Sequence, residues 1–483
     1  MLDPLTCERA RLARDARFDG LFFTGVHSTG VFCRPVCPAP QPKRRNVTYF
    51  PTAAAAVSAG LRPCRRCRPE AAPGTPAWNG TSATVSRAIQ LIRHGALDKG
   101  GVDALAARLG VGARHLRRLF NQHVGVTPVA MANLQRVFFA RQLLAETHFT
   151  ITEIASASGF GSIRRFNAAF RNIFDHSPAA FRRTLPHGSS PGPAAGIRCT
   201  LSLPYRPPYQ WERLLAFFRD RAIANVEKVD HQSYRRTLRT KEVRDSMRVR
   251  HADAGHALVL EIELSDIRGL IPVVERVRRM FDLDADRQAI ADTLILDEQI
   301  KPIVERLPGL PLAGSWDPFE TAVRAIVGQQ ISVKAARTVL SRIVARCEPP
   351  SVKNNADELL HFFPTAEALS AAELTNVGMT GKRVATLKYF AQGVAAGDIQ
   401  LAIGTERSEF VRRMVSLPGI GPWTAQYIAM RALSDPDAFP AGDLGIAQAL
   451  SSNGKRPTYK QIVTRAEKWR PWRAYAATYL WNA

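Results

Sequence analysis

The stretch RSEFVRRMVSLPGIGPWTAQYIAMRAL (407–433) decides the fold of the C-terminal half of this chain. Apolar residues recur at helical spacing on both sides of LPGIGPWTA (417–425), which is rich in Gly and Pro. Pro422 suits the first position of the second helix, and the glycines at 419 and 421 let another backbone approach closely. The stretch therefore predicts two helices joined by a tight hairpin.

Two features near this hairpin indicate chemistry. Backbone N–H groups at the start of such a helix can hold a phosphate without reading a base, so we predict that Gly419, Ile420 and Gly421 contact a nucleic-acid backbone. An ordinary turn between two helices is the alternative. The chain then continues into FPAGDLGIAQAL (439–450), which places Asp443 22 residues after the second hairpin glycine.

The composition favours a folded protein that binds a polyanion. The 483 residues include 66 Lys and Arg against 42 Asp and Glu, a net charge of +24, while 46% of the residues are hydrophobic. This length predicts three or four domains. A disordered basic tail or a membrane-surface protein is the alternative, but the positive charge is spread over segments with apolar periodicity, which favours nucleic acid.

The sequence indicates a location in the cytoplasm. No stretch approaches about 18 uninterrupted apolar residues, and MLDPLTCERARLARDARFDG (1–20) has Arg and Asp where a signal peptide has its apolar region. We therefore expect no membrane partner. Seven cysteines are too few for a disulfide scaffold in a chain of this length.

Four of these cysteines are spaced as ligands of one metal ion. Three residues separate Cys33 from Cys37, two separate Cys64 from Cys67, and 26 lie between the pairs. Two such knuckles can close a tetrahedral site of four thiolates around one Zn²⁺. On spacing alone, a zinc ion that only holds a small domain together is the alternative.

An internal repeat lies between two predicted linkers, AAPGTPAWNGTSA (71–83) and PHGSSPGPAAG (186–196). Residues 105–128 align with residues 154–178, so that Gly110, Phe120 and Pro128 match Gly159, Phe170 and Pro178. Each copy has a short helix, a turn with Gly, and a second helix with Arg on one face and apolar residues on the other. This is the helix-turn-helix pattern, and two such units suit two successive major grooves of DNA.

The predicted fold is multidomain and mainly α. After residue 197, CTLSLPYRPPYQW, YRRTLRT and HALVLEIEL have strand character around the helical stretch WERLLAFFRDRAIANV (211–226), and helices with short breaks follow. We therefore expect a small zinc-bound α/β domain, a paired helix-turn-helix domain, a small α/β domain and an all-α domain with the hairpin. The predicted boundaries are 1–75, 84–185, 197–283 and 284–483.

The residues around the four cysteines carry a family resemblance. DGLFFTGVHSTGVFCRPVCPAP (19–40) and NVTYFPTAAAAVSAGLRPCRRCRPE (46–70) closely resemble the N-terminal domain of the Ada response protein family. In that family the first cysteine of the set both binds zinc and accepts a methyl group from a phosphotriester in alkylated DNA, which implies both roles for Cys33. A zinc-bound thiolate is deprotonated at neutral pH and remains nucleophilic. Losing one negative charge beside basic residues such as Arg34 and Arg66 is expected to raise the affinity for DNA.

Residues 86–185 resemble the AraC-type DNA-binding module, which follows the zinc domain in the Ada family. The resemblance implies promoter DNA as a partner, and we expect RNA polymerase as a second one. The candidate DNA contacts in the second helix of each unit are Arg114, Arg117, Arg118, Arg164 and Arg165. For each of them, contact with the DNA backbone or solvent alone is the alternative. The Pro-Cys-His-Arg motif of the second Ada methyltransferase domain does not occur in the sequence, so reversal of O6-alkylguanine is not expected.

The hairpin, the Gly- and Pro-rich loop and the following Asp together resemble the helix-hairpin-helix (HhH-GPD) glycosylase superfamily. There the Asp is catalytic, which implies that Asp443 stabilises positive charge on the sugar while the N-glycosidic bond breaks, and orients or activates water. Capping the following helix is an alternative role that does not exclude catalysis. Members that also cut the DNA backbone carry Lys two residues past the second hairpin glycine. Trp423 stands there in this chain, which implies a monofunctional hydrolase.

Within that superfamily, residues 198–483 resemble AlkA-type 3-methyladenine glycosylases. The resemblance implies a base pocket lined by aromatic side chains whose electron-rich faces attract a base made cationic by alkylation, and core packing is the alternative for any one of them. Gln330 stands where family members, some with Leu, supply the side chain that fills the gap left by a flipped base. The family implies no cofactor for this half, except that a monovalent cation can bind at the hairpin. The predicted pocket residues are Phe217, Trp423, Tyr427 and Trp481.

Together the resemblances imply a bacterial alkylation-response protein. We expect it to excise alkylated purines such as 3-methyladenine from double-stranded DNA, and to accept methyl groups from methylphosphotriesters and so activate transcription. One alternative is a transcription regulator whose glycosylase-like half only binds DNA. Another is a repair enzyme whose N-terminal half only recruits it to damage. We expect a monomer associated with the nucleoid.

Overall fold

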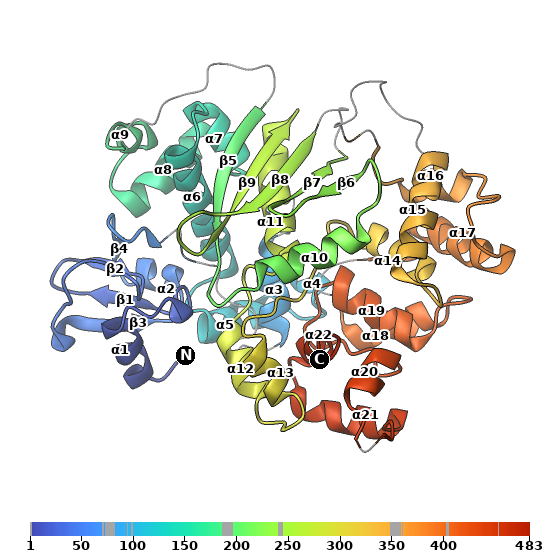
Figure 1. The fold of residues 1–483 in the computed structure, drawn as a ribbon. Coiled ribbons are helices and arrows are strands. Elements are labelled where there is room, and N and C mark those ends of the chain that lie inside the picture. The colour runs from blue at the N-terminus through green and yellow to red at the C-terminus, as the bar shows by residue number, and fades with distance from the viewer. Residues whose placement is uncertain are drawn as a thin grey trace. The chain divides into compact units, whose positions relative to one another are not determined.

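The computed structural model describes residues 2–69, 72, 83–93, 95–97, 100–185, 197–239, 245–347, 359, 361–401, 405–452 and 454–483 (Figure 1). Both predicted linkers lie outside the described residues, except at positions 72 and 83. The chain falls into two compact units. The first comprises Met1–Pro207, Ala252–Glu275 and Leu283–Ala285, and the second comprises Pro208–His251, Arg276–Asp282 and Asp286–Ala483.

The first unit begins with a four-stranded sheet of order β3-β1-β2-β4. Strand β1 is antiparallel to β2 and β3, whereas β2 is parallel to β4. Phe22 and Phe32 are fully buried, and Cys7 packs with Phe22 in the same cluster. The elements are α1 (Pro4–Leu12), η1 (Ala16–Phe18), β1 (Phe23–Val26), β2 (Val31–Cys33), η2 (Arg44–Asn46), β3 (Val47–Phe50), α2 (Ala53–Ser58) and β4 (Arg62–Pro63).

Helices follow in the same unit and form the predicted repeat. Gly110 and Gly159 have φ of +70° and +75°, a left-handed conformation that glycine adopts at no steric cost. Phe120 and Phe170 are both fully buried, and each matched proline is the first residue of the next helix. The helices are α3 (Ala83–Arg93), α4 (Val102–Arg108), α5 (Ala113–His123), α6 (Pro128–Glu146), α7 (Ile151–Ala157), α8 (Ile163–Phe174) and α9 (Pro178–Arg183).

The strands predicted after residue 197 are present. In the first unit β5 (Ile197–Pro204) is antiparallel to β9 (Ala257–Leu264), whose residues alternate between buried and partly buried. In the second unit β7 (Ser233–Thr237) is antiparallel to both β6 (Glu227–Val229) and β8 (Ser246–His251), and helix α10 packs against β6 and β7.

Helix α10 (Trp211–Arg221) is shorter than the predicted helical stretch 211–226. Ala222 already has extended dihedral angles, and the backbone N–H of Ile223 donates to the Glu227 carboxylate at 2.9 Å. This hydrogen bond turns the chain into β6, because it replaces the helical partner of that amide.

The remainder of the second unit is helical, and the hairpin helices α18 and α19 pack on each other. Helix α14 packs on α19 and α17. The remaining elements, of which η4 lies in the first unit and α11 belongs partly to each, are η4 (Ile267–Gly269), α11 (Leu270–Met280), α12 (Arg287–Leu294), α13 (Lys301–Arg306), α14 (Pro318–Val327), α15 (Val333–Cys347), α16 (Ala366–Ala371), α17 (Gly381–Ala395), α18 (Arg407–Val415), α19 (Pro422–Ala432), α20 (Leu444–Ala449), α21 (Tyr459–Ala466), η5 (Glu467–Trp469) and α22 (Arg473–Leu480).

The core of the second unit also contains a charged cluster. Arg236 Nη2 lies 2.8 Å from the Glu320 carboxylate, and Arg324 Nη2 lies 2.6 Å from both Glu320 and Glu227. The hydroxyl of buried Tyr234 donates to Glu227 at 2.6 Å. Each buried charge in the cluster has a partner of opposite charge, which offsets the cost of removing it from water. The ion pairs connect β6, β7 and α14.

The predicted fold class is confirmed: the chain is multidomain and mainly α, with two small sheet-containing parts. Among the described residues, no helix has both the length and the apolar character required to cross a membrane.

Candidate functional site

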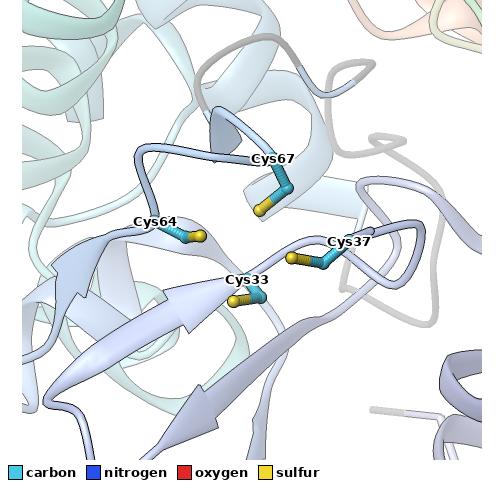
Figure 2. A group of neighbouring side chains, drawn as sticks. All are labelled: Cys33, Cys37, Cys64 and Cys67. Atoms are coloured by element: carbon cyan, nitrogen blue, oxygen red, sulfur yellow. The ribbon is translucent and has the colours of Figure 1, made fainter. Parts of the chain in front are cut away.

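The four predicted zinc ligands meet at one point (Figure 2). Cys33 ends β2, and Cys64 directly follows β4. Parallel pairing of these strands sets the two cysteines side by side, since Cys64 N–H donates to the Phe32 carbonyl at 3.0 Å. A turn after each of them carries Cys37 and Cys67, and Figure 2 shows all four sulfurs directed toward a common centre.

The geometry of the cluster fits zinc. The four sulfur atoms lie within 4.8 Å of one another, and a tetrahedral ion with Zn–S bonds of about 2.3 Å requires S···S separations of about 3.8 Å. All four cysteines are free of disulfide bonds, and three of them are buried.

Without a bound cation, the pKa values of the four thiols move in opposite directions, so the thiols do not all ionise together. Hydrogen bonds among the sulfurs, from Cys33 first, lower the pKa of Cys37 to about 7 and also lower that of Cys64. The same bonds raise the pKa of Cys33 and Cys67. Because neighbouring thiolates repel each other, a bound divalent cation would favour the form in which all four are ionised.

Backbone donors distinguish the four sulfurs. Arg34 N–H donates to Cys67 Sγ at 3.3 Å, and backbone N–H groups also bond to Cys37 and Cys64. Among the described residues, hydrogen bonds from backbone N–H groups are therefore found at Cys37, Cys64 and Cys67. An N–H···S bond draws electron density from a thiolate and so lowers the nucleophilicity of that sulfur.

The predicted DNA-contacting arginines project from one face of the second helix in each repeat. Arg114, Arg117 and Arg118 on α5 are exposed, as are Arg164 and Arg165 on α8. The opposite faces are buried against the helical core. Ser162, another residue near this face, is the N-cap of α8, and its Oγ accepts a hydrogen bond from the Arg165 N–H at 3.3 Å.

The predicted hairpin occupies residues 416–421. Gly419 has φ of +79°, and a Cβ atom there would lie 2.4 Å from Thr386 Oγ1. Ile420 is 4% exposed, whereas Gly421 has open space around it and precedes Pro422, the first residue of α19. The hairpin thus has a buried anchor and an accessible tip of backbone.

Asp443 accepts hydrogen bonds from three different segments. Its Oδ2 accepts from Trp423 Nε1 at 2.9 Å, and its Oδ1 accepts from Trp481 Nε1 at 2.9 Å. The backbone N–H of Ile446 donates to Oδ1 at 3.1 Å, since Asp443 is also the N-cap of α20. These three hydrogen bonds fix the orientation of the carboxylate.

The predicted aromatic residues gather beside this carboxylate. Trp423 and Tyr427, one turn apart on α19, stack with ring centroids 5.2 Å apart. Tyr427 and Trp481 lie 6.2 Å apart at 54°. Phe217 of α10 joins them through Arg431, whose Cζ lies 4.8 Å from the Phe217 ring and within 5.6 Å of the rings of Tyr427 and Trp481. Sequence reasoning missed Arg431, which its position on the Tyr427 face of a helix could have indicated.

Gln330 lies in the turn after α14, where it is exposed and has φ of +58°. Its neighbour Gln329, which sequence reasoning did not single out, connects that turn to the hairpin. Gln329 Nε2 donates to the Gly419 carbonyl at 3.1 Å and to Thr424 Oγ1 at 2.9 Å. The two adjacent glutamines in VGQQIS (327–332) are the sequence feature that could have indicated this contact.

A four-thiolate site beside paired helix-turn-helix units, with a capped Asp and aromatic rings at a helical hairpin, defines a DNA-damage response class of protein. Family models match four segments: "Metal binding domain of Ada" at 6–70, "Helix-turn-helix domain" at 105–184, "AlkA N-terminal domain" at 200–317, and "HhH-GPD superfamily base excision DNA repair protein" at 323–472.

The chain is 39% identical over 476 residues to the "Probable bifunctional transcriptional activator/DNA repair enzyme AlkA" of Mycobacterium tuberculosis, covering 99% of this chain and 95% of that protein. The chain belongs to this family of bifunctional transcriptional activator/DNA repair enzymes. The cysteine cluster of this chain is accordingly the site of one Zn²⁺, and the chain has DNA as a partner.

Other relatives match one half each. The "DNA-3-methyladenine glycosylase 2" of Escherichia coli is 32% identical over 289 residues, which cover 58% of this chain and 96% of that protein. The E. coli "Bifunctional transcriptional activator/DNA repair enzyme Ada" is 36% identical over 146 residues, 30% of this chain and 40% of that protein. The solved 3-methyladenine DNA-glycosylase from Archaeoglobus fulgidus has a TM-score of 0.51 at 22% identity over 58% of this chain and 96% of its own, which shows a shared fold.

Proposed function

We propose that the second unit hydrolyses the N-glycosidic bond of alkylated purines such as 3-methyladenine in double-stranded DNA, as a monofunctional glycosylase. The convergence of Trp423, Trp481 and the N-terminus of α20 on Asp443 carries this proposal, because it fixes a carboxylate beside aromatic rings that suit a base. The tryptophan at 423, where a lyase would need an amine, supports a hydrolase that leaves an abasic site.

In the proposed reaction the hairpin backbone at Gly419–Gly421 holds a DNA phosphate, and the flipped base stacks among Phe217, Trp423, Tyr427 and Trp481. The electron pair of the C1′–N bond leaves with the base, and positive charge develops on the sugar. Asp443 stabilises that charge and takes a proton from the water whose oxygen bonds to C1′. Gln330 would fill the gap in the duplex.

We propose that Cys33 takes a methyl group from a DNA methylphosphotriester once per molecule. Bound zinc would keep the four sulfurs deprotonated at neutral pH. The new bond joins Cys33 Sγ to the methyl carbon, and the methyl C–O bond breaks with its electron pair left on the phosphate oxygen. The backbone N–H of Arg34 supports methylation at Cys33, because it donates a hydrogen bond to Cys67 Sγ and so lowers the nucleophilicity of that sulfur.

Methyl transfer removes one negative charge from the cysteine cluster, which weakens repulsion from DNA phosphates. The arginines of α5 and α8 would then bind promoter DNA, with RNA polymerase as the recruited partner and a monomer as the active species. We assign these roles to domains at 1–75, 84–185, 197–283 and 284–483.

The test uses DNA with labelled methyl groups and compares the full-length protein with Cys33→Ser and Asp443→Asn. The unmodified protein should retain label and release labelled base. Cys33→Ser should lose only the retained label, and Asp443→Asn only the released base. Each variant serves as the control for the other, because their chemistries lie in different compact units.

Three results would contradict these proposals. Release of no base by the unmodified protein would reduce the second unit to a DNA-binding fold. Absence of label on the protein would leave the zinc site purely structural. If promoter activation and base excision both stayed unchanged in Cys33→Ser, the N-terminal half would be assigned to recruitment alone.

A further inference from the structure

The aromatic rings beside Asp443 surround a buried cation. Arg431 is only 4% exposed, and its Cζ lies 4.8 Å from the ring centroid of Phe217. The corresponding distances are 5.6 Å to Tyr427 and 5.4 Å to Trp481. Three of the four predicted pocket rings therefore already contact a guanidinium.

This guanidinium carries an uncompensated charge. Its Nη1 donates to the Ala313 carbonyl at 2.8 Å, but its buried Nε has no hydrogen-bond partner. No carboxylate in the part of the chain that the structure describes forms an ion pair with Arg431. Burial lowers its pKa and the nearby Arg221 acts in the same direction, whereas Tyr427 opposes them. Arginine nevertheless keeps its charge at neutral pH.

We propose that Arg431 is a specificity-determining residue that biases the base pocket against cationic bases and toward uncharged ones. The inference rests on the proposed function, because it requires that these aromatic residues receive the extruded base. A ring whose face is engaged by one cation attracts a second cation less. A cationic base stacked on these rings would also be repelled by the buried positive charge of the guanidinium.

Cleavage of the N-glycosidic bond adds a second effect, which also favours uncharged bases. When the N-glycosidic electron pair leaves with the base, a cationic base departs neutral, whereas an uncharged base departs as an anion. The guanidinium stabilises that anion and does nothing for a neutral leaving group. The pocket therefore recognises lesions by stacking and ease of departure, with the arginine extending it to bases that carry no positive charge.

The experiment measures charge preference with an isosteric pair of bases. The full-length Asp443→Asn protein, which leaves the base in place, is titrated with duplexes that contain either 7-methylguanine, a cation, or 7-deaza-7-methylguanine, its uncharged isostere. The readout is the ratio of the two Kd values. Contacts elsewhere on the DNA are the same in both duplexes, so they cancel in this ratio.

We expect Arg431→Met in that background to shift the ratio about tenfold toward the cationic base. Arg431→Lys keeps the charge and should leave the ratio close to that of the parent. The matched control is Arg287→Met, which removes another buried guanidinium that lies 4.6 Å from the Tyr209 ring. This control should not move the ratio.

An unchanged ratio in Arg431→Met would overturn the inference, and so would an equal shift in Arg287→Met. If Arg431→Met does not fold, Arg431→Gln removes the charge while keeping an amide donor for the Ala313 carbonyl, and its ratio decides. Failure of the proposed function looks different, because the unmodified protein would then release no 7-methylguanine from the duplex. In that event both proposals fail.

Discussion

At the scale of single residues, Asp443 shows how one side chain can cap a helix and still be available for the proposed catalytic role. As the N-cap of α20 it satisfies a backbone amide, and the two indole donors of Trp423 and Trp481 orient it. The sequence already allowed both roles, since capping the following helix does not exclude catalysis. The geometry makes them compatible, because each oxygen of an ionised carboxylate can accept more than one hydrogen bond.

Replacing Trp423 with Phe tests this arrangement. Phe can still stack on Tyr427 but has no N–H for Oδ2, so the rate constant for base release should fall about ten- to a hundredfold, the value of a hydrogen bond to a charged group. Single-turnover assays at saturating protein measure this rate. Trp469→Phe is the matched control, since Trp469 Nε1 donates to a different carboxylate, that of Asp297, at 3.1 Å. An equal loss of rate in both variants would contradict the prediction.

At the scale of secondary-structure elements, the hairpin between α18 and α19 depends on one glycine more than on the other. Gly419 combines a left-handed φ with the close approach of Thr386, whereas Gly421 has φ of −88° and nothing within 4 Å of a Cβ atom. Both residues belong to the same Leu-Pro-Gly-x-Gly motif. Only the backbone conformation separates their structural roles.

Gly419→Ala should therefore lower the free energy of unfolding by roughly 1–3 kcal/mol, since alanine is strained at this φ and its Cβ meets Thr386 Oγ1. Denaturant unfolding of the full chain measures the change. Gly421→Ala should have the stability of the unmodified protein. If the two substitutions were equally costly, the hairpin backbone would differ from that described.

Helix α5 is another element with two distinct faces. Arg117→Ala on its exposed face should leave stability unchanged and reduce the dependence of promoter binding on salt by roughly one unit of the log–log slope, if that arginine contacts a phosphate. Leu116→Ala, on the fully buried face, should instead destabilise the domain by about 2–5 kcal/mol. Fluorescence anisotropy at several salt concentrations, together with thermal unfolding, distinguishes the two effects. A salt slope that stays the same in Arg117→Ala would remove this residue from the DNA contacts.

At the scale of the whole molecule, each compact unit holds one of the two candidate sites. The cysteine cluster is built from residues 33–67, all in the first unit. The Asp443 site draws on α10, α19, α20 and the end of α22, all in the second. Loss of one activity therefore need not disturb the other.

The buried charged cluster of the second unit predicts how this unit responds to acid. Burial opposes ionisation of Glu320, but Arg236 and Arg324 together outweigh it and lower its pKa from 4.5 to about 2. Because the folded pKa is depressed, the stabilisation is complete above pH 4.5 and is lost as the pH falls toward 2. We expect a loss of about 3 kcal/mol across this window.

Urea unfolding at pH 7 and at several values between 4.5 and 2.5 checks this expectation. Glu320→Gln should be destabilised at pH 7 and show a weaker pH dependence, because the titrating carboxylate is gone. Glu305→Gln is the control, since Glu305 is 61% exposed and its contact with Lys301 is 4.0 Å long. An equally steep acid transition in Glu320→Gln would assign the effect to other carboxylates.

The amino-acid sequence by itself determined much of this protein. Local patterns indicated the zinc ligands, the repeat with its two glycines, the hairpin and the mainly α fold, because knuckle spacing, helical periodicity and the special conformations of Gly and Pro are properties of neighbouring residues. The end of α10 was predicted five residues too late, since the Glu227 carboxylate that turns the chain at Ile223 acts through a side-chain bond that periodicity does not report.

Only the tertiary structure decided how distant residues combine. It brought Trp481 to Asp443 across 38 residues, set Gln329 against the hairpin across 90, and placed Arg431 among rings from α10 and the end of α22. No local pattern contains these contacts, because they depend on how helices pack and which side chains meet in the core. The charge at the centre of the aromatic set is therefore a property of the fold.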